Sequence, residues 1–131
     1  ATPIPRTDRR RILIADDDAM ILRMLRAIIE TEGYQVITAA DGREAFEILQ
    51  QDADFSAVIF DMIMPHMRGT DLINYMKTEE QLSSIPIGMI TGDSKTWGDT
   101  VALGASVFLP KPFTPPQIQM MLRMLVKTGS H

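Results

Sequence analysis

The chain has 131 residues, a length typical of one domain with one hydrophobic core. It has no cysteine, which excludes a thiol nucleophile, a disulfide framework and a cysteine-ligated zinc site. The net charge of −4 argues against general binding to nucleic-acid phosphates, so we expect no direct nucleic-acid binding. No secretory signal occurs, and no apolar run approaches the roughly 20 residues that cross a bilayer. We therefore expect a cytoplasmic protein without membrane contact.

The first residues contain prolines and arginines without periodicity and predict a flexible tail over residues 1–10. The short arginine run that ends at Arg11 is expected to be a solvated flank rather than a nucleic-acid patch. We expect the domain to cover residues 11–127 and a C-terminal tail to cover residues 128–131.

Short apolar runs predict five buried strands, at residues 12–15, 34–38, 58–61, 85–90 and 107–109. Helical spacing of apolar residues predicts five helices. Four of them begin at Ala19, at the Asp41-Gly42 turn, after Gly69 and at Thr114-Pro115, and one closes with Thr100, Val101 and Leu103 before Gly104. This alternation predicts an α/β fold in which helices cover both faces of a parallel sheet.

Asp61 ends the apolar run Val58-Ile59-Phe60, and Pro65 stops regular structure four positions later. In open α/β sheets, ligands bind outside the carboxyl ends of the strands, so an acid at this position is well placed for chemistry. A capping or turn aspartate is the alternative, and Asp61 alone does not decide between the two.

Other polar side chains follow the ends of predicted strands, namely Asp16, Asp17, Thr91 and Lys111. Because parallel strands end at one edge of a sheet, we expect these side chains to lie beside Asp61. Three carboxylates would repel one another there unless a cation joined them, and oxygen ligands suit Mg²⁺. Lys111 could pair with Asp61 or with a phosphoryl oxygen, while Thr91 offers a hydroxyl and Gly92 an approachable backbone N–H.

This set of residues has what phosphoryl transfer to a carboxylate requires: a nucleophile, a metal that neutralises charge, and donors for the phosphoryl oxygens. A carboxylate is already ionised at neutral pH, so no general base is needed. Neither His66 nor His131 is expected to have a chemical role.

The ordered set of short motifs resembles the receiver domain of two-component response regulators, in particular the chemotaxis regulators. The matching pieces are Ile12-Leu13-Ile14-Ala15-Asp16-Asp17, Ala40-Asp41-Gly42, Phe60-Asp61-Met62 with Met64-Pro65 and Gly69, Ile90-Thr91-Gly92, Gly104-Ala105 and Lys111-Pro112-Phe113. Each motif is weak alone, but the ordered set spans residues 12 to about 126 and is highly specific.

The resemblance implies a flavodoxin-like, doubly wound sheet of five parallel strands in the order 2-1-3-4-5, with five helices. Asp61 would be the phosphoacceptor, and Lys111 would contact the phosphoryl group together with Thr91 and Gly92. Mg²⁺, or Mn²⁺ in its place, would be held by Asp16, Asp17, Asp61 and the backbone carbonyl of Ile63. The Lys111–Pro112 peptide bond is expected to be cis.

By the same resemblance, Thr91 would be the switch hydroxyl and Phe108 the switch aromatic residue. Phosphorylation would draw in Thr91, move the ring of Phe108, and reshape the face made by the fourth helix, fifth strand and fifth helix. Phe108 could equally be a plain core residue, and Met120 and Met124 could either bind a partner or cover the core edge. Ile63 could hinder water that attacks the phosphoryl group, whereas Asp93 could orient it. The sequence therefore does not settle the lifetime of the phosphoryl group.

The implied phosphodonor is a sensor histidine kinase or a histidine phosphotransfer protein, and the implied output is a target protein that binds the reshaped face. The protein would be a switch that modifies only its own Asp61, not an enzyme acting on other molecules. A homodimer through the same face stays open, as does the choice between a free-standing receiver and part of a longer regulator or hybrid kinase.

Three other functions are alternatives to a phosphoacceptor. A receiver-like interaction module without phosphorylation would have the same fold. A phosphohydrolase of the haloacid dehalogenase type would need a second acid two residues after the nucleophile, where this chain has Ile63, and a cap domain. Flavin binding would need a Ser/Thr-rich phosphate loop after the first strand, where acids stand instead.

Overall fold

The computed structural model describes residues 10–92 and 104–129, with side chains described up to Val126. The predicted fourth helix and Asp93 lie outside these residues, as does nearly all of the predicted N-terminal tail. Within the described residues, no helix is long and apolar enough to span a membrane.

Five parallel strands form a single sheet. They are β1 (Arg11–Ala15), β2 (Gln35–Ala39), β3 (Ala57–Asp61), β4 (Ile87–Thr91) and β5 (Val107–Pro110). Their order, β2-β1-β3-β4-β5, confirms the predicted order 2-1-3-4-5 and the flavodoxin-like fold. All residues of β3 and β4 are buried, as expected of central strands that are covered on both faces.

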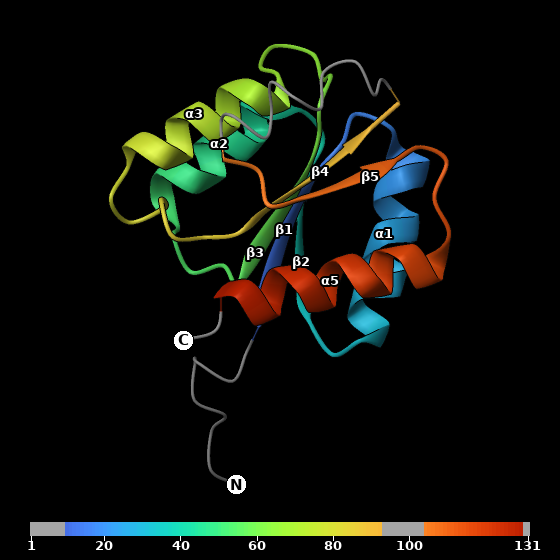
Figure 1. Cartoon of the computed structure of the whole chain (residues 1–131). Coiled ribbons are helices and arrows are strands. Elements are labelled where there is room, and N and C mark those ends of the chain that lie inside the picture. Colours follow the sequence, from blue (N-terminus) through green and yellow to red (C-terminus); the bar gives the residue numbers. More distant parts are fainter. Residues whose placement is uncertain (1–9, 93–103, 130–131) are drawn as a thin grey trace, which may run out of the picture.

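The described helices are α1 (Ala19–Thr31), α2 (Gly42–Gln51), α3 (Gly69–Thr78) and α5 (Pro115–Gly129). Figure 1 shows α1 and α5 on one face of the sheet and α2 and α3 on the other. α5 runs two residues beyond the predicted domain end at residue 127.

Alternate residues of β1 supply two separate cores. Leu13 and Ala15 pack with the residues of α2 and α3, whereas Ile12 and Ile14 pack with those of α1 and α5. This alternation follows from the two-residue period of a strand, and it explains why β1 is apolar from Ile12 to Ala15. The helical spacing of Ile118, Met121, Leu122 and Leu125 predicts an inward stripe for α5, and all four residues are buried.

Two strands begin later than the sequence predicts, whereas β1 and β3 each begin one residue earlier, at Arg11 and Ala57. β2 begins one residue later than predicted, because the N–H of Tyr34 donates to Ile29 O at 3.4 Å and so belongs to the turn that ends α1. β4 begins two residues later, because the N–H of Ile85 is held in a turn by Leu82 O at 3.1 Å and Pro86 has no N–H to donate.

Arg11 is not the solvated flank that the sequence suggested. It is the first residue of β1, and its guanidinium donates to Asp52 Oδ2 at 2.7 Å and to the Asp54 carbonyl at 2.9 Å. The same group lies over the ring of Phe55, 4.8 Å from its centroid. Arg11 therefore ties the start of the sheet to the segment between α2 and β3.

Candidate functional site

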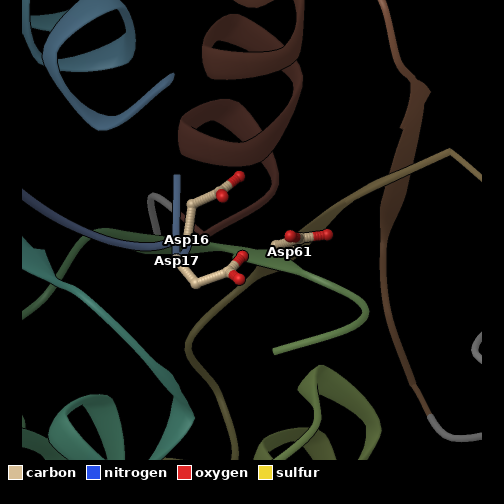
Figure 2. A group of neighbouring side chains, drawn as sticks. All are labelled: Asp16, Asp17 and Asp61. Carbon is tan, nitrogen blue, oxygen red and sulfur yellow. The ribbon is translucent and has the colours of Figure 1, made fainter. Parts of the chain in front are cut away.

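The predicted acids meet where β1 and β3 end. Asp16 directly follows β1, and Asp61 is the last residue of β3. The register pairs Ala15 with Phe60, which brings the next residue of each segment, Asp16 and Asp61, to the same edge. Figure 2 shows the side chains of Asp16, Asp17 and Asp61 gathered at this edge, and one carboxylate oxygen from each lies within 4.8 Å of the others. Asp16 and Asp61 are buried, and Asp17 is exposed.

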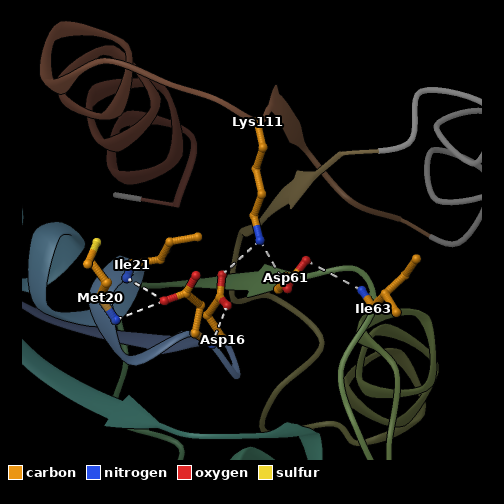
Figure 3. A network of polar contacts seen from close by, with 7 residues as sticks. Asp16, Met20, Ile21, Asp61, Ile63 and Lys111 are labelled. Carbon is orange, nitrogen blue, oxygen red and sulfur yellow. Dashed lines mark hydrogen bonds and ion pairs between the residues drawn. The ribbon is translucent and has the colours of Figure 1, made fainter.

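Lys111 reaches this cluster from the end of β5. Its Nζ lies 3.2 Å from Oδ2 of Asp61 and 3.2 Å from Oδ2 of Asp16, as the dashed lines in Figure 3 show. The Lys111–Pro112 bond is cis, as expected. The N–H of Lys111 donates to the Thr91 carbonyl at 2.9 Å, so its backbone is joined to the end of β4. One ammonium thus forms ion pairs with two buried carboxylates.

Burial, and after it the negative charge of Asp16, raises the pKa of Asp61. The Lys111 ammonium and the Ile63 N–H, 3.4 Å from Oδ1, lower the pKa only in part. For Lys111, burial lowers the pKa, but the attraction of Asp61 and Asp16 outweighs it and leaves the pKa raised. The geometry therefore favours a charged lysine. Its single positive charge does not balance the negative charge of the neighbouring carboxylates.

A divalent cation fits the residues that are present. Oδ2 of Asp16 is buried and, among the described residues, accepts no hydrogen bond, although Lys111 lies nearby as an ion-pair partner. That single ammonium is shared with Asp61, so the three neighbouring carboxylates keep a net negative charge that a divalent cation would neutralise. The oxygen-only donor set of Asp16, Asp17 and Asp61 suits Mg²⁺ rather than a softer metal.

Two further predicted residues frame the site. Thr91 is buried as the last residue of β4, next to Ile90, which pairs with Asp61 across the sheet. Gly92 follows it and is exposed, and a Cβ built there would meet nothing within 4 Å. Thr91 and Gly92 thus lie at the end of the strand that pairs with the end of β3.

Phe108 lies in β5, farther from the acids. It is half-buried against the core under α2 and α3, and it also lines a groove of about 370 Å³ between β5 and α5. Met120 and Met124 line the same groove and are 56% and 49% exposed. The groove is the described part of the face that the sequence predicted for a target protein.

The loop after Asp61 is held by contacts that the sequence analysis did not assign. The N–H of Met62 donates to Ile90 O and that of Gly69 to Met62 O, each at 3.0 Å. A Cβ on Gly42 would collide with the backbone carbonyl of Met67, and one on Gly69 would lie 2.7 Å from Asp61 O. The glycines of the motifs thus permit close backbone approach, which their spacing alone does not reveal.

Asp18 has a structural role that the sequence did not predict. Its Oδ1 accepts from the N–H groups of Met20 at 2.9 Å and Ile21 at 3.3 Å, so it is the N-cap of α1. An aspartate immediately before a predicted helix start was the signal that could have revealed this cap.

The model of the response regulator receiver domain family matches residues 12–123 of the chain. The chain belongs to this family. Over 122 residues, the receiver domain is 33% identical to the chemotaxis protein CheY1 of Helicobacter pylori, with 91% of this chain and 98% of CheY1 covered. It is 34% identical to the probable transcriptional regulator ycf27 of Cyanophora paradoxa, covering 92% of this chain but only 49% of that protein. The receiver domain thus spans about half the length of that regulator and nearly all of CheY1.

A solved structure extends this likeness to the fold. The chemotaxis response regulator CheY4 of Vibrio cholerae superposes on the receiver domain with a TM-score of 0.82 and 32% identity, covering 89% of this chain and 98% of CheY4. Receiver domains are signalling switches of two-component systems and not enzymes that act on other molecules. The acidic cluster and Lys111 lie at the sheet edge where the fold places ligands.

Proposed function

We propose that Asp61 is the phosphoacceptor of this receiver domain and that a divalent cation assists the transfer. The observation that carries the proposal is the convergence of Asp61, Asp16, Asp17 and Lys111 on one sheet edge, with Oδ2 of Asp16 left without a hydrogen bond among the described residues. Asp16, Asp17, Asp61 and the backbone carbonyl of Ile63 would hold Mg²⁺, or Mn²⁺ in its place. The bound cation would neutralise charge on the phosphoryl oxygens.

The phosphodonor we propose is a phosphohistidine of a sensor kinase or of a phosphotransfer protein. The ionised carboxylate of Asp61 attacks phosphorus, a P–O bond forms, the P–N bond breaks, and the imidazole leaves with the bonding electrons. Lys111 already lies 3.2 Å from Oδ2 of Asp61, so its ammonium can pair with an oxygen of the transferred group. Thr91 and Gly92 would donate to the remaining oxygens from the end of β4.

We further propose that phosphorylation is transmitted to the groove between β5 and α5. The backbone of Lys111 is bonded to that of Thr91, and β5, which carries Phe108, directly precedes Lys111. A shift of Thr91 and Lys111 toward a phosphoryl group would therefore act on β5 and on the groove lined by Phe108, Met120 and Met124. Methionines repack easily, which suits a surface that binds a target in one state only.

The proposal is tested by intact-mass measurement after incubation with Mg²⁺ and a small acyl phosphate. Wild type should gain one phosphoryl group, and the gain should disappear in Asp61→Asn and on chelation of the metal. Asp17→Asn is the matched variant, because it removes a carboxylate of the cluster but keeps the acceptor, so it should still be modified at raised Mg²⁺. A folded wild type that binds Mg²⁺ but gains no mass would show a receiver-like interaction module with a silent site.

A further inference from the structure

Asp18 is the third acid of the run Asp16-Asp17-Asp18, but its carboxylate faces the helix that follows. Oδ1 accepts from the N–H groups of Met20 and Ile21, both labelled in Figure 3, and so caps α1. The carboxylate oxygens that converge within 4.8 Å come from Asp16, Asp17 and Asp61. Asp18 therefore differs from its two neighbours in what its side chain binds.

The backbone of Asp18 joins this cap to the acidic cluster. Its N–H donates to Oδ1 of Asp16 at 2.9 Å, and its carbonyl accepts from the N–H of Leu22 at 3.0 Å. With Oδ1 held in this way, the other oxygen of Asp16 is the one that lies 3.2 Å from Lys111 Nζ. That oxygen belongs to a side chain that is almost fully buried, and it accepts no hydrogen bond within the described part of the chain.

We infer that Asp18 is a positioning residue for the cation site: by capping α1 it fixes its own N–H, and that N–H holds the carboxylate of Asp16 in the orientation that binds the metal. The inference rests on the proposed Mg²⁺ site. Without the cap, the first turn of α1 loses a partner for two N–H groups and frays. The N–H of residue 18 then no longer has a fixed direction, and the Asp16 carboxylate can rotate away from the cation.

The test compares Asp18→Ala with Asp18→Asn. Both substitutions remove one negative charge, but asparagine is as good an N-cap as aspartate whereas alanine is not. The matched control is Asp41→Ala, because Asp41 caps α2 through the N–H of Glu44 at 2.8 Å and is not one of the converging carboxylates. Titration calorimetry with MgCl₂ alone gives the dissociation constant, and thermal unfolding in chelator gives the stability of the metal-free protein.

We expect Asp18→Ala to raise the Mg²⁺ dissociation constant about tenfold, as for loss of other groups that orient metal ligands. Asp18→Asn should change it by no more than about twofold, the effect of one exposed charge. Both Asp18→Ala and Asp41→Ala should lower the melting temperature by about 3 to 5 °C, the usual effect of losing one cap. The dissociation constant of Asp41→Ala should equal that of wild type.

Two results would overturn the inference. If Asp18→Asn weakened Mg²⁺ binding as much as Asp18→Ala, the charge of residue 18 would matter and the cap would not. If Asp18→Ala lost stability but kept the wild-type dissociation constant, the cap would serve the helix alone. A wild type that binds no Mg²⁺ would reject the cation site of the proposed function itself, which calorimetry reveals before any variant is compared.

Discussion

The ammonium of Lys111 lies 3.2 Å from the carboxylate of Asp61, although 50 residues separate them in the chain. The same nitrogen is equally close to Asp16, so Lys111 occupies the position from which positive charge stabilises both buried acids. A bound cation would act on the same oxygens. Lysine and metal therefore compete electrostatically in the unphosphorylated protein.

Lys111→Ala should bind Mg²⁺ more tightly than wild type, because the competing positive charge is gone. One partly exposed ion pair is worth up to about 1 kcal/mol, so we expect the dissociation constant to fall roughly threefold to fivefold. Calorimetric titration measures it. Lys77→Ala, which removes an equal charge from α3, should leave the constant unchanged. Equal constants for Lys111→Ala and wild type would show that the ammonium does not compete with the metal.

Lys111→Ala should also keep the fold, but phosphorylation of this variant should no longer change the conformation of β5. The side chain is the proposed link between the phosphoryl oxygens and the backbone that joins Thr91 to β5. Amide NMR shifts of β5, recorded with and without acyl phosphate, report this coupling. If the variant is phosphorylated and shows the wild-type shift changes, the role assigned to Lys111 is wrong.

Gly42→Ala should destabilise the protein, since the added Cβ would collide with the Met67 carbonyl in the loop that follows Asp61. Forced overpacking of this kind costs about 1–3 kcal/mol. Gly92→Ala is the control, because its Cβ would meet nothing within 4 Å, and it should change stability by less than about 0.5 kcal/mol. Urea unfolding compares the two, and similar losses would mean that the loop moves aside without cost.

The raised pKa of Asp61 predicts a pH dependence of the metal-free protein. A carboxyl whose pKa is higher folded than unfolded binds more protons in the folded state, so its ionisation lowers stability as pH rises from the ordinary value of 3.8 through the raised one. The Asp61→Asn variant has no carboxyl group to ionise at this position, so it does not lose stability in this way. In chelator, the variant should therefore become more stable relative to wild type as pH rises from about 4 to about 7, as followed by urea unfolding.

A constant stability difference between Asp61→Asn and wild type over that range would contradict the prediction, because it would place the folded pKa of Asp61 at its ordinary value. Adding Mg²⁺ should reduce the difference, since a cation stabilises the ionised carboxylate.

Arg11→Ala should cost about 1–3 kcal/mol of folding stability, because it removes the ion pair of the half-buried guanidinium with Asp52 and uncovers the ring of Phe55. Arg26→Ala provides the comparison. Arg26 forms an exposed pair with Glu30 within α1, and its loss should cost no more than about 0.5 kcal/mol. Denaturant unfolding of both variants measures the loss of stability. Equal small losses would show that the contacts of Arg11 contribute no more than those of an exposed side chain, as the sequence suggested.

The parts of the fold that the sequence predicted well are those with a local cause. The apolar run of residues 12–15 and the helical spacing of apolar residues in α5 are both local patterns, and the structure confirms a buried strand and a buried helix stripe. The late starts of β2 and β4 were missed because Tyr34 and Ile85 are apolar but are held in turns by backbone bonds to Ile29 and Leu82. Periodicity does not reveal which backbone group binds another.

The sequence by itself determined the five strands, their sheet class and the acids that end them, because residue type and short-range spacing decide secondary structure and the carboxyl ends of parallel strands share one edge. Only the tertiary structure decided which side chains touch. It placed Lys111 between Asp16 and Asp61, turned Asp18 toward α1, brought Gly42 against Met67 and bound Arg11 to Asp52. These contacts depend on strand register and on loops that cross between distant segments, and no local pattern encodes such distances.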